Sequence, residues 1–157
     1  MAEESKKKRL TTDEVILSPV TLDDPTSLTE GFYLAFASWL NEKEPEHLRP
    51  EHSVRIRRQA MRLKPSLCMP NTKWTKATPK YDPSRIIGHA GWVTPDVEEV
   101  YNLWRRDAWE KFGWAEEYGL SEEEVEELWS GTDLVKWQDN VVKYDRLRKE
   151  VMGEEKH

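Results

Sequence analysis

Every segment with a β-strand pattern in this sequence lies before Pro95, and every segment after it repeats its apolar residues at helical spacing. The β-rich segments are residues 14–21, 73–78 and 85–93, and the last (RIIGHAGWV) is bounded by Asp-Pro and Thr-Pro. β-Branched and aromatic residues favour strands, and such boundaries end them. The sequence therefore predicts three strands, of which the second and third form an antiparallel hairpin with a loop slightly longer than the tightest type.

Two helices are expected between the first and second strands. Asp24 and Pro25 are typical of a helix start, because aspartate can cap free backbone N–H groups and proline suits the first helical position. A second helix is expected from Glu51 to Lys64 and should end near Pro65, since proline disfavours helical backbone in the residue before it. The apolar stripe of the first helix consists of Leu28, Phe32, Phe36, Trp39 and Leu40, and the outer face of the second would carry Arg55, Arg58 and Arg62.

The last part of the chain is expected to contain three helices. The first runs over residues 97–112, and Gly113 interrupts it. Ser121 and Glu124 form a capping-box pattern that predicts the start of the second helix. The third is expected over residues 132–152. Aromatic side chains dominate the stripes of these helices, and we expect them to need a larger sheet than three strands to cover them.

These elements give a fold of class α/β (α+β), with the order β-α-α-β-β followed by three helices. We expect residues 1–12 to form a disordered tail, because they are polar and charged, and residues 13–157 to form one domain. Charged residues make up 34% of the chain, which is high for a globular domain, so the core should depend on its eight tryptophans.

Charge and composition exclude several classes of partner. The net charge of −6 argues against a general nucleic-acid binder, which needs a large positive face. No apolar run approaches the roughly 20 residues that span a bilayer, and the N-terminus lacks the apolar segment of a secretory signal. Cys68 is the only cysteine, so no intramolecular disulfide can form and a reducing compartment is the natural setting. We therefore expect a cytoplasmic or nuclear protein that binds neither nucleic acid nor membrane.

Few side chains are candidates for chemistry. His47 and His52 lie near several glutamates, but their spacing matches no common zinc pattern, so we expect a solvated loop and no metal site. Cys68 has no basic neighbour in the sequence and is interpreted as a small hydrophobe rather than a nucleophile. His89, on the best-defined strand, could act as a base near neutral pH, although a structural or exposed histidine is the commoner case.

Residues 85–90 match the pattern R-x-x-G-x-A, which in a phosphate-binding loop must follow a strand and precede a helix. The residues after them continue a strand and end at Pro95. We therefore interpret Gly88 and Gly91 as strand glycines that mark a bulge or a close backbone approach, and we expect no cofactor-binding residue in this chain.

A family resemblance is carried by four segments: residues 20–24 (VTLDD), residues 28–36 (LTEGFYLAF), the strand containing Lys76, and residues 86–95 (IIGHAGWVTP). Together they resemble the opening half of GNAT-superfamily acyl-CoA N-acyltransferases, especially the fungal GNAT-like proteins. The last segment is similar to the family's (I/V)xGxxxW strand. The resemblance implies a partial GNAT-like fold, with residues 96–153 as a helical insertion, and an acetyltransferase-like transfer to an amine.

In that family a fourth strand follows, and then a loop patterned (Q/R)-x-x-G-x-(G/A) that binds the cofactor pyrophosphate. The sequence ends at His157, before such a strand, so we expect the acyl-CoA-binding half to be missing and the chain to be inactive alone. Acetyl-CoA or another acyl-CoA would be the cofactor of a longer protein. The resemblance places Phe36, Trp39 and Trp92 in the substrate groove, and His89 is added from its position on the strand. It assigns no catalytic residue.

Two other interpretations stay open. The chain could be a noncatalytic interaction module, whose exposed aromatic helices bind a protein partner or a second copy of the chain. It could also be a fragment of a gene product that continues past His157. Because one fold can serve many substrates, the sequence names no acceptor.

Overall fold

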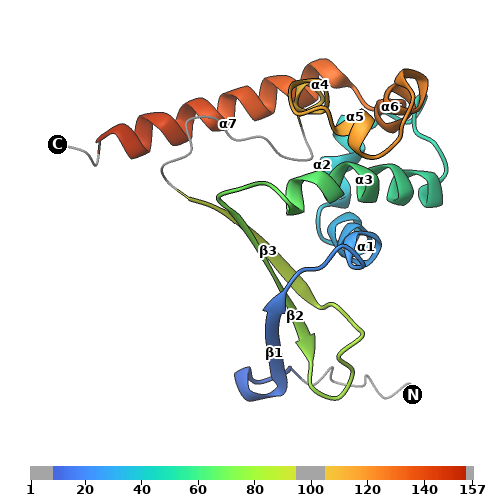
Figure 1. Cartoon of the computed structure of the whole chain (residues 1–157). Coiled ribbons are helices and arrows are strands. Elements are labelled where there is room, and N and C mark those ends of the chain that lie inside the picture. The colour runs from blue at the N-terminus through green and yellow to red at the C-terminus, as the bar shows by residue number, and fades with distance from the viewer. Residues whose placement is uncertain (1–8, 95–104, 155–157) are drawn as a thin grey trace.

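A computed structural model describes residues 9–94 and 105–154 as a mixed α/β structure that is 55% helical. Its antiparallel sheet has the order β1-β2-β3, so the three expected strands and the hairpin are confirmed. Figure 1 shows the helices gathered at one end of the sheet, while β1 and the hairpin loop project away from them. The strands are β1 (Val15–Pro19), β2 (Thr72–Pro79) and β3 (Gly88–Val93).

The ends of the strands follow from local chemistry. Pro19 is tolerated because β1 is an edge strand, where a missing N–H breaks no inner ladder. β3 begins later than expected, and the Ile87 N–H donates to the Ala77 carbonyl from the preceding loop (2.9 Å). Where the tail is expected to end, Thr12–Glu14 form a short 3-10 turn, and residues 1–8 lie outside the described residues.

Three helices, rather than two, separate β1 from β2. The first expected helix is divided at Phe36, whose backbone (φ −121°, ψ 28°) leaves the helical region. The second continues past Pro65, because a proline in the last turn removes only one intrahelical hydrogen bond. The elements are α1 (Pro25–Ala35), α2 (Ala37–Lys43) and α3 (His52–Leu67).

The C-terminal part is helical, as expected. Gly113, in the left-handed region (φ 67°), separates two short helices, and residues 95–104 of the expected first helix lie outside the described residues. The capping box is confirmed: Glu124 N–H donates to Ser121 Oγ (3.2 Å), and Ser121 N–H donates to Glu124 Oε2 (2.8 Å). These helices are α4 (Asp107–Lys111), α5 (Trp114–Glu117), α6 (Glu122–Trp129) and α7 (Leu134–Glu154).

The described tryptophans of these helices do not need a larger sheet. They pack on one another and on α2 and α3, at a distance from the three strands (Figure 1). A second, smaller cluster joins α1 and α3 to the covered face of the sheet through Leu28, Leu63 and Trp74. The buried tryptophans of the helical cluster are Trp109, Trp114, Trp129 and Trp137.

The basic face of α3 is covered, not exposed as expected. Arg62 is only 1% exposed, and its guanidinium lies over Trp129 (4.5 Å) and Trp137 (5.4 Å). Arg58 donates to the Ser130 carbonyl at the end of α6 (2.9 Å). Arginine can lie flat on aromatic rings and donate several hydrogen bonds, so a basic helix face can bind the aromatic helices above it.

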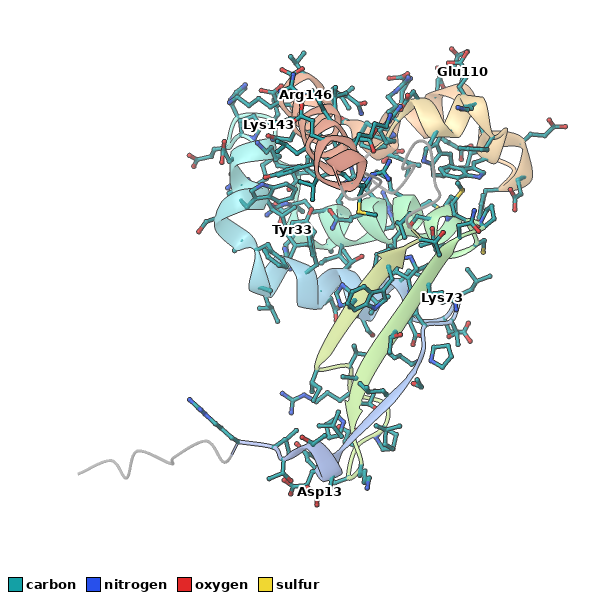
Figure 2. The ribbon with its side chains drawn as sticks, turned by 90° about the vertical axis from the view of Figure 1, so that its left-hand side faces the viewer. Asp13, Tyr33, Lys73, Glu110, Lys143 and Arg146 are labelled. Atoms are coloured by element: carbon teal, nitrogen blue, oxygen red, sulfur yellow. The ribbon has the colours of Figure 1, made fainter. Side chains whose placement is uncertain are left out.

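The helices packed around Trp109, Trp129 and Trp137 form one helical body, and Tyr33 lies inside it, as Figure 2 shows. Its hydroxyl donates to Glu44 Oε1 (2.8 Å), and Arg55 donates to the other oxygen of the same carboxylate (2.6 Å). The carboxylate therefore joins α1 to α3 although it lies just beyond α2. Burial, together with the Glu44 charge, raises the pKa of Tyr33 well above its usual value, so the phenol stays a hydrogen-bond donor.

Candidate functional site

A groove of about 730 Å³ lies between α1 and β3. Its volume is within the range of small-molecule sites, about 300–1,000 Å³. Phe32 of α1 and Phe36, between α1 and α2, form one wall, and residues 85–91 form the other. Trp74 of β2 and Leu63 of α3 also line it, so α1, α3, β2 and β3 all contribute to the groove.

Gly91 allows Trp74 to lie across the neighbouring strand. The two residues are paired in the β2–β3 register, and a Cβ on Gly91 would lie 2.9 Å from the indole ring. The imidazole of His89 stacks beside the same ring, with centroids 6.2 Å apart and planes at 28°. The close approach expected at Gly91 is therefore present, but a side chain makes it rather than backbone. No atom lies within 4 Å of a Cβ placed on Gly88.

An ion pair fixes the start of α1 against the sheet. The sequence suggested that the Asp24 side chain caps α1, but it makes no capping hydrogen bond. Its carboxylate instead accepts hydrogen bonds from Lys76 Nζ of β2 (2.7 Å to each oxygen) and from Thr21 N–H (2.7 Å). Burial opposes ionisation of this carboxyl, but these donors outweigh it and lower the pKa of Asp24. The wall formed by α1 is thus held at a fixed distance from β3.

The groove is largely apolar and has one full charge. None of its lining residues is an aspartate or glutamate, and Arg85 at the start of the β3 wall is the only lysine or arginine among them. Burial lowers the pKa of His89, so its imidazole is neutral at neutral pH. A neutral imidazole can accept a proton from a bound ligand.

The structure brings together two of the four residues expected in a substrate groove. Phe36 and His89 both line it. Trp39, on α2, does not line the groove but packs edge-on against its wall residue Phe32, with ring centroids 6.3 Å apart, and its ring lies 5.5 Å from that of Trp137. Trp92 is 66% exposed, and strand alternation places it on the sheet face opposite His89 and Gly91. Sequence reasoning missed Trp74 and Arg85 as groove residues.

The remaining candidates form no site. His52 begins α3 and packs edge-on against Tyr33, with ring centroids 5.6 Å apart, and the Cys68 thiol is free and exposed. Across residues 9–94 and 105–154, no group of three or more His, Cys, Asp or Glu side chains could hold a metal ion. No helix among the same residues is both long and apolar enough to cross a membrane.

The R-x-x-G-x-A match at residues 85–90 does not form a pyrophosphate cradle. A pyrophosphate cradle needs glycine-rich backbone that leads into a helix N-terminus. In the R-x-x-G-x-A match, Gly88 is the first residue of β3 and Gly91 lies inside the same strand, so no helix follows the pattern directly. The match is therefore strand and loop, as the sequence indicated.

Comparison of the chain with protein-family models, with curated proteins and with solved structures gives no match. The functional assignment therefore depends on the groove and on the sequence resemblance alone.

Proposed function

We propose that the chain is the acceptor-binding portion of a GNAT-like N-acyltransferase, and that the groove between α1 and β3 holds the amine. The observation that supports this proposal best is that Phe36 and His89, selected from different segments of the sequence, line one groove. The groove also runs beside β3, the edge strand that no described strand pairs with on its outer side.

The chemistry of the groove suits an amine acceptor. An amine is a nucleophile only in its unprotonated form, and a groove without carboxylates, in which His89 is neutral, favours that form over the ammonium. The phenyl rings of Phe32 and Phe36 and the indole of Trp74 provide apolar contact for the rest of the molecule. No transfer step follows from these residues, because the acyl donor has no fitting site among them.

The amine site is tested by ligand-detected NMR with phenethylamine, which combines an amine with one aromatic ring. We expect saturation transfer to the ligand in the wild type and a strong loss in the variant Phe36→Ala, which removes part of the apolar wall. Trp92→Ala is the matched control, because it removes an exposed aromatic side chain from the other face of the sheet. Equal signals in both variants, or no signal in the wild type, would contradict the proposed acceptor site.

The donor half of the proposal is tested by calorimetric titration with acetyl-CoA. We expect no binding tighter than about 1 mM, equivalent to roughly 4 kcal/mol. Tighter binding by residues 1–157 would show that a cofactor site exists in this chain.

A noncatalytic interaction module is the second candidate, and both the sheet and α7 expose apolar side chains that favour it. Leu17 (71% exposed) and Trp92 (66% exposed) lie on the uncovered sheet face, and α7 exposes Val142, Tyr144 and Val151 (60% each). Exposed apolar side chains of this size often mark contact with another protein. Sedimentation equilibrium tests the module: we expect concentration-dependent association that Trp92→Ser weakens, and a monomer at all concentrations would contradict self-association through the sheet.

A further inference from the structure

We propose that the ligand of this groove carries a carboxylate beside an apolar body, and that a hydrophobic amino acid is its simplest form. The inference that the ligand also has an amine rests on the proposed function. The inference of a carboxylate and an apolar body rests on the residues that line the groove. The proposal separates apolar amino acids from polyamines and other polycations, which the same fold class could equally serve.

The charges that line the groove favour an anionic group. Polycations need carboxylates to replace their water, and no Asp or Glu lines this site. Lys76, on the same sheet face, is neutralised by Asp24 (2.7 Å). His89 carries no charge at neutral pH. Arg85 therefore provides the only uncompensated charge among the lining residues, and that charge is positive.

The guanidinium of Arg85 is available to a ligand. No side chain in the described part of the chain forms an ion pair with it, and its backbone N–H donates to the Asp82 carbonyl (3.2 Å). The Asp82 carboxylate, its nearest acidic neighbour in sequence, accepts instead from Ser84 Oγ (2.6 Å). A planar guanidinium binds a carboxylate through two parallel hydrogen bonds, which a lysine cannot reproduce.

The proposal is tested with three probes of one shape: 3-phenylpropionate has the carboxylate alone, phenethylamine the amine alone, and L-phenylalanine both. Affinities are measured by protein-detected NMR titration of the wild type, Arg85→Gln and Arg85→Lys. The matched control is Arg9→Gln, which removes the same charge from an exposed position outside the groove. Spermidine serves as the polycation.

We expect 3-phenylpropionate and L-phenylalanine to bind about fivefold more tightly than phenethylamine, the scale of one ion pair at an exposed arginine. Arg85→Gln should remove that advantage, Arg85→Lys should keep part of it, and Arg9→Gln should leave it unchanged. Spermidine should bind more weakly than either carboxylate.

Phenethylamine or spermidine binding as tightly as 3-phenylpropionate would overturn the proposal, as would full affinity in Arg85→Gln or no binding of any carboxylate. The two proposals fail separately. Carboxylate binding that depends on Arg85, without any binding of phenethylamine, supports the carboxylate site and contradicts the amine acceptor. Phenethylamine binding that is unchanged in Arg85→Gln, without any binding of a carboxylate, supports the amine acceptor and contradicts the carboxylate site.

Discussion

The helical body and the sheet bury their aromatic residues to very different extents. In the body, Trp109, Trp129 and Trp137 are each 2% exposed and are enclosed by other helices. The sheet has one face against α1 and α3, while its other face leaves Leu17 and Trp92 largely in solvent. Figure 1 shows the same contrast, because the helices lie to one side of the sheet and its far end is uncovered.

This difference indicates that the body contributes mainly to stability and that the region near the sheet contributes mainly to ligand binding. The core of the body includes Tyr33 of α1 and Ile56 of α3 and closes without the sheet, so α1 and α3 are held on the side away from the strands. The sheet depends on those helices for one face only, and the groove lies where the two regions meet. Mutations should therefore have their largest effects on stability in the body and on ligand binding near β3.

The largest expected effect is that of Trp129→Ala, which removes a buried ring from the body. Large-to-small substitutions of this kind cost about 3–5 kcal/mol of unfolding free energy, because the cavity is only partly filled by relaxation. The same change at exposed Trp92 should cost less than about 0.5 kcal/mol. Urea denaturation measures both. Equal losses at the two positions would contradict the contrast between body and sheet.

The next effect is that of Asp24→Asn, which breaks the ion pair between α1 and β2. We expect a loss of about 2 kcal/mol at pH 7, the scale of hydrogen bonds to a charged group. The pKa of Asp24 is lowered below its usual 3.8, so its contribution is present above that pH and disappears as the pH falls further.

The stability difference between wild type and Asp24→Asn should therefore be constant from pH 7 to about pH 5 and shrink below about pH 4. Asp13→Asn, at the far end of the sheet in Figure 2, is the control and should cost little at any pH. A difference that grows on acidification would contradict the ion pair.

A smaller effect is expected from Gly91→Ala. The added Cβ would meet the Trp74 indole at 2.9 Å, and overpacking of this kind costs about 1–2 kcal/mol. Gly88→Ala is matched to it, because the same atom at Gly88 meets nothing within 4 Å, and its cost should be near zero. Thermal unfolding of the pair checks this, and equal melting temperatures would show that Trp74 is free to move.

Local patterns were enough to predict the strands, the capping box and most helices, because each depends on neighbours in sequence. The burial of Arg62 could not be read from its own helix, where a basic stripe is typical of a solvent face. Its partners Trp129 and Trp137 lie far along the chain. Lys76 and Asp24 are likewise 52 residues apart, and neither has a local signal for the pair.

The candidate site was partly predictable for the same reason. Phe36 and His89 were selected from their segments and do line the groove, but Trp39 and Trp92 do not. Residue 92 could have been excluded by strand alternation, since it must face away from His89. Trp39 is expected on the same stripe as Phe36, but the helix is interrupted at Phe36, and Trp39 packs behind Phe32 instead of lining the groove.

The smallest expected effect is that of Arg62→Met. Burial lowers the pKa of Arg62 to about 10, and its Nε and Nη1 atoms have no hydrogen-bond partner among the described residues. Removing such a charge offsets the loss of its contacts with Trp129 and Trp137, so the stability should change by less than about 1 kcal/mol. Urea denaturation with a loss above about 3 kcal/mol would mean that the aromatic contacts dominate.

The most direct test of the division between body and groove is an amide and indole NMR map of the wild type during titration with L-phenylalanine. We expect shifts in the amides of α1 and β3 and in the indole N–H of Trp74, while the indole signals of Trp109, Trp129 and Trp137 stay in place. Shifts centred on the tryptophans of the body, with α1 and β3 unchanged, would contradict the groove as the binding site.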